Sequence, residues 1–279
     1  MSFLGIDANK SGKDADWIEK IIFFNIYYCT NRICIKKIIR KVRVQTIHLK
    51  TSSLHDLTPA NLSVIVAPHP DDEVFGCCGL MQRLIAQGKR VELIIMTGGG
   101  KSHAGCCDID ESELIRQRRQ LTIRAAKEYG LSQEYIHFLD YPDGGVLESD
   151  SQTDKLSSLI HKIVDGQNDV SVFYPHKNGE GWSDHVTTSN IVSHLFDKIC
   201  PNAKQYEYCV WFWFYNCWKI DWKQACLVRM NKKEHAVKLK AIDVYIEPKA
   251  PCGKPWSGVL PPVFLWANKW DKELYFRVK

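Results

Sequence analysis

The chain has 279 residues, of which 45% are hydrophobic and 25% are charged, so its composition allows an ordinary buried core. This length fits one α/β domain with an extension. The net charge of +5 comes entirely from residues 1–60, which hold ten Lys and Arg against five Asp and Glu. Because the rest of the chain has no basic excess, we expect no nucleic-acid partner.

The eleven cysteines are odd in number and include no C-x-x-C pair. The spacing of a structural zinc finger is therefore missing, and the count differs from that of a secreted disulfide framework. Residues 1–10 lack the charged and apolar regions of a signal peptide, and no apolar run reaches the roughly 18 residues that span a bilayer. We expect a cytoplasmic protein with reduced thiols.

The N-terminal region combines apolar and basic side chains over residues 17–46, as in an amphipathic helix. Such a helix either lies on an anionic membrane surface or packs on the domain with a solvated basic face, and we favour the packed arrangement. We assign residues 1–56 to an N-terminal extension and residues 57–279 to the catalytic domain. Membrane association, where it occurs, is expected through this extension.

Strands and helices alternate along the middle of the chain. Short apolar runs predict strands at residues 62–67, 90–97, 135–139 and 170–174, and helical spacing predicts helices at 79–87, 111–129, 154–164 and 183–198. This alternation predicts an α/β fold with a doubly wound, mostly parallel, Rossmann-like sheet and helices on both faces. In such a sheet, ligands bind beyond the carboxyl ends of the strands.

The C-terminal third is less regular, with strands expected near 207–215 and 225–230, a helix near 232–244 and then a proline-rich tail. Residues 206–222 contain nine aromatic side chains. Strand alternation would place Trp211, Trp213 and Tyr215 on one face, and Phe212 and Phe214 on the other. This segment is either a platform that stacks on sugars or a strand buried on both faces, and we favour the buried strand.

The first predicted strand is followed by Ala67-Pro68-His69-Pro70-Asp71-Asp72-Glu73. A tight turn, stiffened by Pro70, can aim His69 and Asp72 at one point. Asp71 lies between them and is left able to act on a water molecule. A solvated turn is the alternative, but the position at a strand end favours a metal site.

A catalytic zinc takes three nitrogen or oxygen ligands and keeps one position open. The best candidate for the third ligand is His185, which begins the helix after the fourth strand. Asp184, beside it, is interpreted in one of two ways: as a carboxylate that stabilises the helix N-terminus, or as a group that orients a metal ligand. Imidazole ligands favour zinc, although another divalent ion fits as well.

These motifs resemble those of the PIG-L/LmbE-like metal-dependent N-deacetylases. The resemblance spans roughly residues 62–245 and rests on the 67–73 motif, with Pro68 as an extra residue, on Trp182-Ser183-Asp184-His185, on Arg118 and on residues 138–144. It implies that His69, Asp72 and His185 bind one zinc ion and that Asp71 is the general base. Arg118, Trp182 and Asp184 are then expected to contact the substrate. That substrate would be an N-acetylated sugar or sugar conjugate that loses its acetyl group in glycan or glycoconjugate biosynthesis.

One departure from the family pattern concerns the oxyanion. The family often has a histidine three residues before its last ligand, where this chain has Trp182, and the nearby His176 is the candidate substitute. Loss of such a donor typically costs about 10²–10³ in rate. The alternative function is therefore a catalytically impaired, metal-containing carbohydrate-binding module. The Gly98-Gly99-Gly100 run matches no dinucleotide-binding fingerprint and is expected to be a loop over the site or an ordinary turn.

Overall fold

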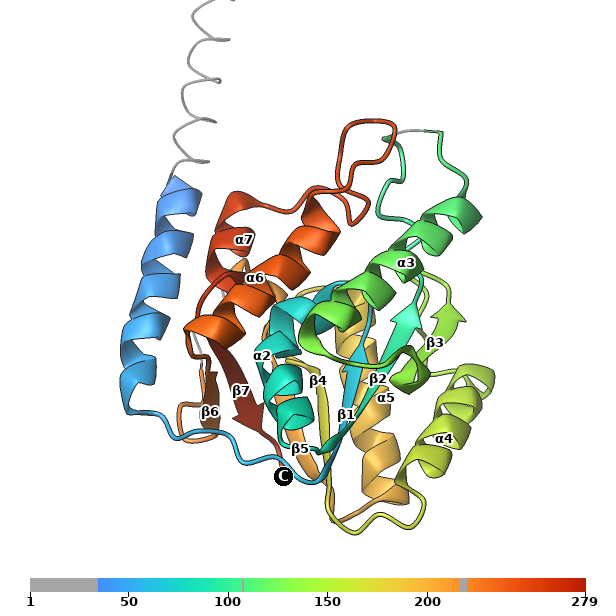
Figure 1. The fold of residues 1–279 in the computed structure, drawn as a ribbon, viewed down its shortest axis with the longest axis vertical. Helices are drawn as coiled ribbons and strands as arrows, with labels where there is room; N and C mark the ends of the chain where they lie inside the picture. The colour runs from blue at the N-terminus through green and yellow to red at the C-terminus, as the bar shows by residue number, and fades with distance from the viewer. Residues whose placement is uncertain (1–34, 107, 216–219) are drawn as a thin grey trace, which may run out of the picture.

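The computed structural model describes residues 35–106, 108–215 and 220–279, which fold around one central sheet (Figure 1). The strands are β1 (Leu62–Ala67), β2 (Arg90–Thr97), β3 (Ile136–Tyr141), β4 (Val170–Pro175), β5 (Lys204–Tyr208), β6 (Ala225–Arg229) and β7 (Lys272–Arg277). The helices are α2 (Asp72–Ala86), α3 (Glu111–Tyr129), α4 (Asp150–Val164), α5 (Ser183–Ile199), α6 (Lys232–Ile246) and α7 (Pro262–Asn268). None of the helices within these ranges has the length and apolar character needed to cross a bilayer.

The strand order of the sheet is β3-β2-β1-β4-β5-β7-β6. The first five strands pair in parallel, and β7 runs antiparallel to both of its neighbours. The chain winds outward in one direction from β1 and in the other from β4, so the order reverses between these two strands. The predicted doubly wound, mostly parallel sheet is therefore confirmed, and its ligand-binding switch point lies beyond β1 and β4.

Both faces of the sheet are covered by helices (Figure 1). Ile65 and Ala67 of β1 face a core shared with α2, α3 and α6, whereas Val64 and Val66 face a core shared with α4 and α5. All six β1 residues are buried, as expected for a central parallel strand. This rigid strand fixes the starting point of the motif at residues 67–73.

Helix α2 begins at Asp72, earlier than the predicted start at residue 79, so part of the motif belongs to the helix. Farther along α2, Glu273 accepts hydrogen bonds from the backbone N–H groups of Gly79 and Leu80, at 2.8 and 3.0 Å. Lys238 pairs with Glu273 at 2.9 Å and donates to the carbonyl of Phe75 at 3.1 Å. In an ordinary α-helix the Gly79 N–H donates to the Phe75 carbonyl. Here Glu273 accepts that N–H and Lys238 donates to that carbonyl, so the buried ion pair contacts both groups of one helical hydrogen bond.

The C-terminal third departs from the prediction in two places. The predicted strand at 207–215 is wrong beyond Tyr208, because residues Trp211–Trp213 form a 3₁₀ turn, η3. The carboxylate of Glu180 accepts the N–H groups of Val210, Trp211 and Phe212, which a continuing strand would need for its ladder. The expected alternation of aromatic faces is therefore lost, and the proline-rich tail contains α7 and β7, which the sequence did not predict.

The predicted helix at 17–46 lies partly outside the described residues, but residues 35–50 are helical and pack on the domain. Arg43 is 1% exposed and donates to the carbonyl of Phe212 at 2.7 Å. The ring of His48 stacks on Trp270 with centroids 3.6 Å apart. Residues 35–50 therefore pack on the domain, while Lys41 and the apolar side chains of Ile38 and Val42 remain exposed.

We expect Arg43→Ala to destabilise the fold by about 1.5–3 kcal/mol, because it removes a charged donor from a buried carbonyl. Its guanidinium also lies 4.7 Å from the centre of the Phe212 ring. The matched control is Lys41→Ala, on the exposed face of the same helix. Urea unfolding measures both, and equal midpoints would show that the helix does not stabilise the domain.

Candidate metal centre

A pocket of about 340 Å³ opens beyond the carboxyl ends of β1 and β4, at the switch point of the sheet. Its wall comes from segments that are distant in sequence: the motif after β1, the loop after β2, the N-terminus of α5, the turn η3 and the C-terminal segment. The residues that line it include His69, Asp71, Asp72, Lys101, Ser102, Arg118, Asp143, Trp182, Asp184, His185, Trp211 and Ser257. Seven of the eight residues predicted from the sequence therefore line this pocket.

The turn after β1 brings His69 into contact with Asp72. The backbone N–H of His69 donates to Asp72 Oδ2 at 3.0 Å, and the ring Nδ1 lies 3.2 Å from the same oxygen. On the other side of the ring, Nε2 lies 3.2 Å from Asp184 and 3.4 Å from Asp143. Burial alone would lower the pKa of His69, but the surrounding carboxylates raise it well above its usual value.

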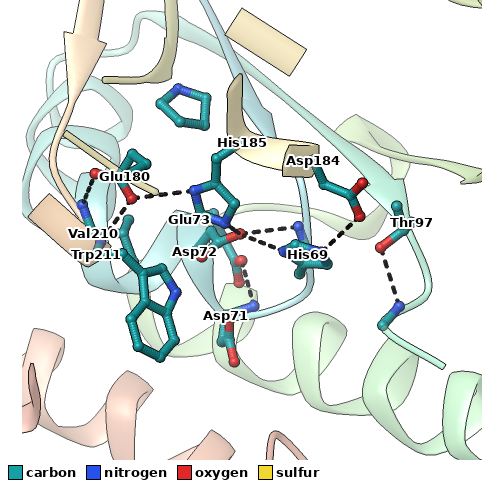
Figure 2. Close-up of polar contacts among 12 residues, drawn as sticks. His69, Asp71, Asp72, Glu73, Thr97, Glu180, Asp184, His185, Val210 and Trp211 are labelled. Carbon is teal, nitrogen blue, oxygen red and sulfur yellow. Dashed lines mark hydrogen bonds and ion pairs between the residues drawn. The ribbon is translucent and has the colours of Figure 1, made fainter. Parts of the chain in front are cut away.

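His185 meets the same carboxylate from helix α5, as Figure 2 shows. Its Nε2 lies 3.2 Å from Asp72 Oδ2, and its Nδ1 lies 3.2 Å from Glu180. Glu180 is fully buried and is held by the backbone N–H groups of η3. A carboxylate behind a histidine ring is the usual device that orients a metal-binding imidazole.

The donor atoms fit a divalent cation. One donor atom from each of His69, Asp72 and His185 lies within 4.8 Å of the others. Both ring nitrogens of His185 are buried without an aligned hydrogen bond, although each faces a carboxylate oxygen. A cation bound among these groups would give a buried ring nitrogen of His185 a partner, and it would offset the negative charge of the clustered carboxylates. His69 also forms a second group with Asp143 and Asp184, but two imidazoles make the first group better suited to zinc.

Asp71 stands beside this cluster in an unusual backbone conformation. Its φ angle is 112°, a positive value that few residues other than glycine adopt, and Asn and Asp tolerate positive φ better than most. The Asp71 N–H donates a hydrogen bond to the Glu73 carboxylate at 2.9 Å, and that carboxylate also accepts one from the Tyr245 hydroxyl. Burial raises the pKa of Asp71 well above its usual value. Asp71 lines the same pocket as His69, Asp72 and His185.

Arg118 of α3 holds this carboxylate from the opposite side. Its Nη2 donates to the Pro70 carbonyl at 2.6 Å and lies 3.3 Å from Asp71 Oδ2, while Nη1 donates to the Gly99 carbonyl at 3.0 Å. Gly99 has a φ of 67°, and a Cβ there would lie 2.1 Å from Arg118 Nη1. The glycine run after β2 thus makes room for the arginine.

Residues 64–196 match the family model described as PIG-L, GlcNAc-PI de-N-acetylase. The chain carries a PIG-L domain. No curated protein matches the sequence. The matched residues run from β1 to α5 and include every predicted metal ligand.

Solved structures share the fold of this PIG-L domain. N,N'-diacetylchitobiose deacetylase from Pyrococcus horikoshii is 23% identical, with a TM-score of 0.53 over 66% of this chain and 69% of that chain. The deacetylase of the A40926 pseudoaglycone is 12% identical, with a TM-score of 0.57 over 77% and 96%. A 4-carboxy-2-hydroxymuconate hydratase from Pseudomonas putida is also 12% identical, with a TM-score of 0.52 over 78% and 96%. Because the fold also carries a hydratase, the reaction has to be argued from the site.

His176 is the predicted site residue that the structure does not bring to the pocket of the PIG-L domain. Its ring packs against Phe212 and Phe276, and its Nε2 faces Glu207 at 3.7 Å. It follows β4, and its backbone N–H bonds the carbonyl of Tyr208, which turns the residue toward β5. The structure therefore places His176 outside the pocket that the other seven predicted residues line.

Trp182 and Asp184 both line the pocket, in different ways. Trp182 is 48% exposed and meets Trp211 edge to face at 5.5 Å, so these two indoles form one side of the opening. Asp184 accepts the backbone N–H groups of Gly144 and Val146, at 2.7 and 3.3 Å. Asp184 therefore anchors the loop that carries Asp143 next to His69.

Sequence reasoning missed Glu180, Asp143 and Tyr245. Glu180 lies between two glycines in a loop, and only its burial reveals its role behind His185. Asp143 belongs to the 138–144 segment that the family resemblance included, which was the available signal. Tyr245 lies on α6 and reaches Glu73 from a distant part of the chain, and no local pattern predicts that contact.

We expect Glu180→Gln to weaken metal binding about 10- to 100-fold, because the carboxylate that orients His185 is lost. The matched control is Glu207→Gln, which changes a carboxylate next to His176, outside the pocket. Competition with a chromophoric chelator measures the affinity of both variants. An unchanged affinity in Glu180→Gln would mean that His185 is not a ligand.

Proposed function

We propose that this chain is a zinc-dependent deacetylase that removes the acetyl group from the amide nitrogen of an N-acetylated sugar or sugar conjugate. The match of residues 64–196 to the de-N-acetylase family model supports a hydrolase of amide C–N bonds. The observation that carries the proposal is the cluster of His69, Asp72 and His185, with Asp71 beside it in the same pocket.

The metal would be held by His69, Asp72 and His185, with the Glu180 carboxylate orienting the His185 ring. When bound, such a cation lowers the pKa of a water molecule toward 7 and polarises a carbonyl group. The remaining catalytic work falls to side chains of the pocket, and their positions suggest a role for each.

Asp71 is the group placed to move protons. It takes a proton from the attacking water and passes it to the amine nitrogen as the C–N bond breaks, which leaves acetate and a free amine. Arg118 keeps the Asp71 carboxylate in position through the ion pair at 3.3 Å. Since Trp182 replaces the family histidine and His176 faces away, the chain itself provides no imidazolium for the oxyanion in the part that the structure describes.

The substrate side of the pocket is aromatic. The indoles of Trp182 and Trp211 stand at its opening, and an indole face suits the apolar face of a sugar ring. The deacetylases of similar fold act on N,N'-diacetylchitobiose and on the A40926 pseudoaglycone, as their names state. These features support a sugar or glycoconjugate as the substrate.

We expect Trp182→Ala to raise KM about 2- to 10-fold with a smaller change in kcat, because stacking binds ground state and transition state alike. The matched control is Trp266→Ala, which removes an indole that is 42% exposed on α7, outside the pocket. Steady-state kinetics on one substrate measures both. A fall in kcat at constant KM would instead place Trp182 in the chemical step.

The decisive experiment is acetate release from a panel of N-acetylhexosamines and their conjugates, with metal-stripped protein and with zinc added back. We expect release that depends on zinc and is lost in His185→Ala. Saturable sugar binding without acetate release would instead identify a metal-containing carbohydrate-binding module.

A further inference from the structure

A second group of side chains of the types that bind metals lies outside the pocket. His103 and Cys106 belong to the loop after β2, and Cys252 belongs to the segment between α6 and α7. His103 Nδ1 lies 3.3 Å from Cys106 Sγ and 3.6 Å from Cys252 Sγ, and the two sulfurs are 3.6 Å apart. Figure 1 shows the two loops meeting beyond the N-terminal end of α3.

The triangle of donor atoms has the dimensions of a zinc site. Zinc bonds thiolate sulfur at about 2.3 Å and imidazole nitrogen at about 2.0–2.1 Å, with tetrahedral angles. These values place two sulfur ligands about 3.8 Å apart and a sulfur and a nitrogen ligand about 3.5 Å apart. The three observed distances lie within about 0.2 Å of this face of a tetrahedron, the tolerance expected of a metal site.

His103 is held in the tautomer that a metal requires. Its Nε2 donates a hydrogen bond to the carbonyl of Pro255 at 2.8 Å, so in the neutral ring Nδ1 carries the lone pair and faces both sulfurs. A backbone carbonyl behind the ring is a common partner of metal-binding histidines. The residue is 3% exposed, so its orientation is fixed by packing.

We propose that His103, Cys106 and Cys252 form a second metal site, which takes Zn²⁺ or a similar thiophilic divalent cation. The two thiols lose their protons to the solvent when the cation binds, so two thiolates and one neutral imidazole hold it. Within the part of the chain that the structure describes, three ligands hold the cation, and the fourth tetrahedral position takes water or another donor. This site is separate from the proposed catalytic metal, which has no sulfur ligand.

The site would fasten one wall of the pocket. Lys101 and Ser102, just before His103, line the pocket, and so does Ser257, close after Cys252. The two loops also touch directly, because Ser102 Oγ donates to the carbonyl of Trp256 at 3.3 Å. A cation bound by Cys106 and Cys252 links segments 146 positions apart, and so ties the loop after β2 to the C-terminal segment.

Cobalt substitution of the full-length protein tests this proposal. Metal-stripped protein titrated with Co²⁺ is expected to show thiolate-to-cobalt charge-transfer absorption and to bind about two ions per chain. Cys106→Ser and Cys252→Ser should each lose this absorption and about one ion. His69→Ala should lose about one ion and keep the absorption, and Cys200→Ser, a cysteine outside the cluster, should change neither.

A second measurement uses the unmodified chain, so it does not depend on how the variants fold. Added Zn²⁺ should protect Cys106 and Cys252 from alkylation, as read by peptide mass spectrometry, and should leave Cys200 unprotected. The proposal is overturned by cobalt binding without thiolate absorption, by absorption that persists in Cys106→Ser, or by a Cys106–Cys252 disulfide that excludes the metal. None of these outcomes depends on deacetylase activity, so the two proposals fail separately.

Discussion

Asp71→Asn is expected to keep its metal and to lower kcat by about 10²–10⁴, the usual contribution of a general base. Asparagine has nearly the shape of aspartate and tolerates the positive φ of 112° at this position. Its amide accepts no proton from water, so the proton transfer is lost, together with the charge that faces Arg118 at 3.3 Å. Acetate release and metal content, measured on the same sample, check both parts of the prediction.

Two controls make this result specific. Asp72→Asn should lose metal, because Asp72 Oδ2 lies 3.2 Å from a ring nitrogen of both His69 and His185. Asp140→Asn changes the other non-glycine residue with a positive φ among those that the structure describes, at 55°, and should change neither quantity. If Asp71→Asn loses the metal and Asp72→Asn keeps it, the two carboxylates have exchanged roles.

Lys238→Met is expected to destabilise the fold by about 3–5 kcal/mol, because it leaves the Glu273 carboxylate buried without its counter-charge. The two side chains are 1% and 2% exposed, and their 2.9 Å contact joins α6 to β7. Glu273 also holds the Gly79 and Leu80 N–H groups of α2, so three elements depend on this one charge. Urea unfolding followed by circular dichroism measures the change.

The matched control for Lys238→Met is Lys269→Met, which breaks an ion pair with Asp243 of the same helix α6. The Lys269 and Asp243 side chains are 38% and 41% exposed, at a distance of 3.5 Å. An exposed pair typically contributes about 0–1 kcal/mol. Similar unfolding midpoints for the two variants would show that solvent reaches the Lys238–Glu273 pair.

Local pattern was enough to predict the parallel strands β1 to β4 and the floor of the pocket. A β-branched run defined β1, and parallel strands that end at one edge brought His69 and His185 together from positions 116 residues apart, as the ring centroids 5.3 Å apart show. Both inferences use only periodicity and the geometry of parallel sheets. The roles of the predicted site residues remain predictions for the variants above.

The parts that sequence reasoning missed depend on long-range contacts. The strand predicted beyond Tyr208 stops because Glu180, in another loop, takes the backbone N–H groups of η3. In β7, Glu273 is buried by pairing with Lys238 of α6, so the strand lacks a simple hydrophobic alternation. The same limit applies to Cys252, whose contact with Cys106 depends on the folded loops.

The position of β7 has a consequence for synthesis of the chain. Among the named strands, β6 pairs with β7 alone, and β7 is the last of them to be made. The five parallel strands can pair in the order in which they leave the ribosome, but β6 has to wait while α6 and α7 are translated. At about 5–20 residues per second, that interval lasts roughly 2–9 s. During it β6 lacks its ladder with β7 and has only the bridge of Leu227 to residues 55–57, so its other edge stays open to a chaperone.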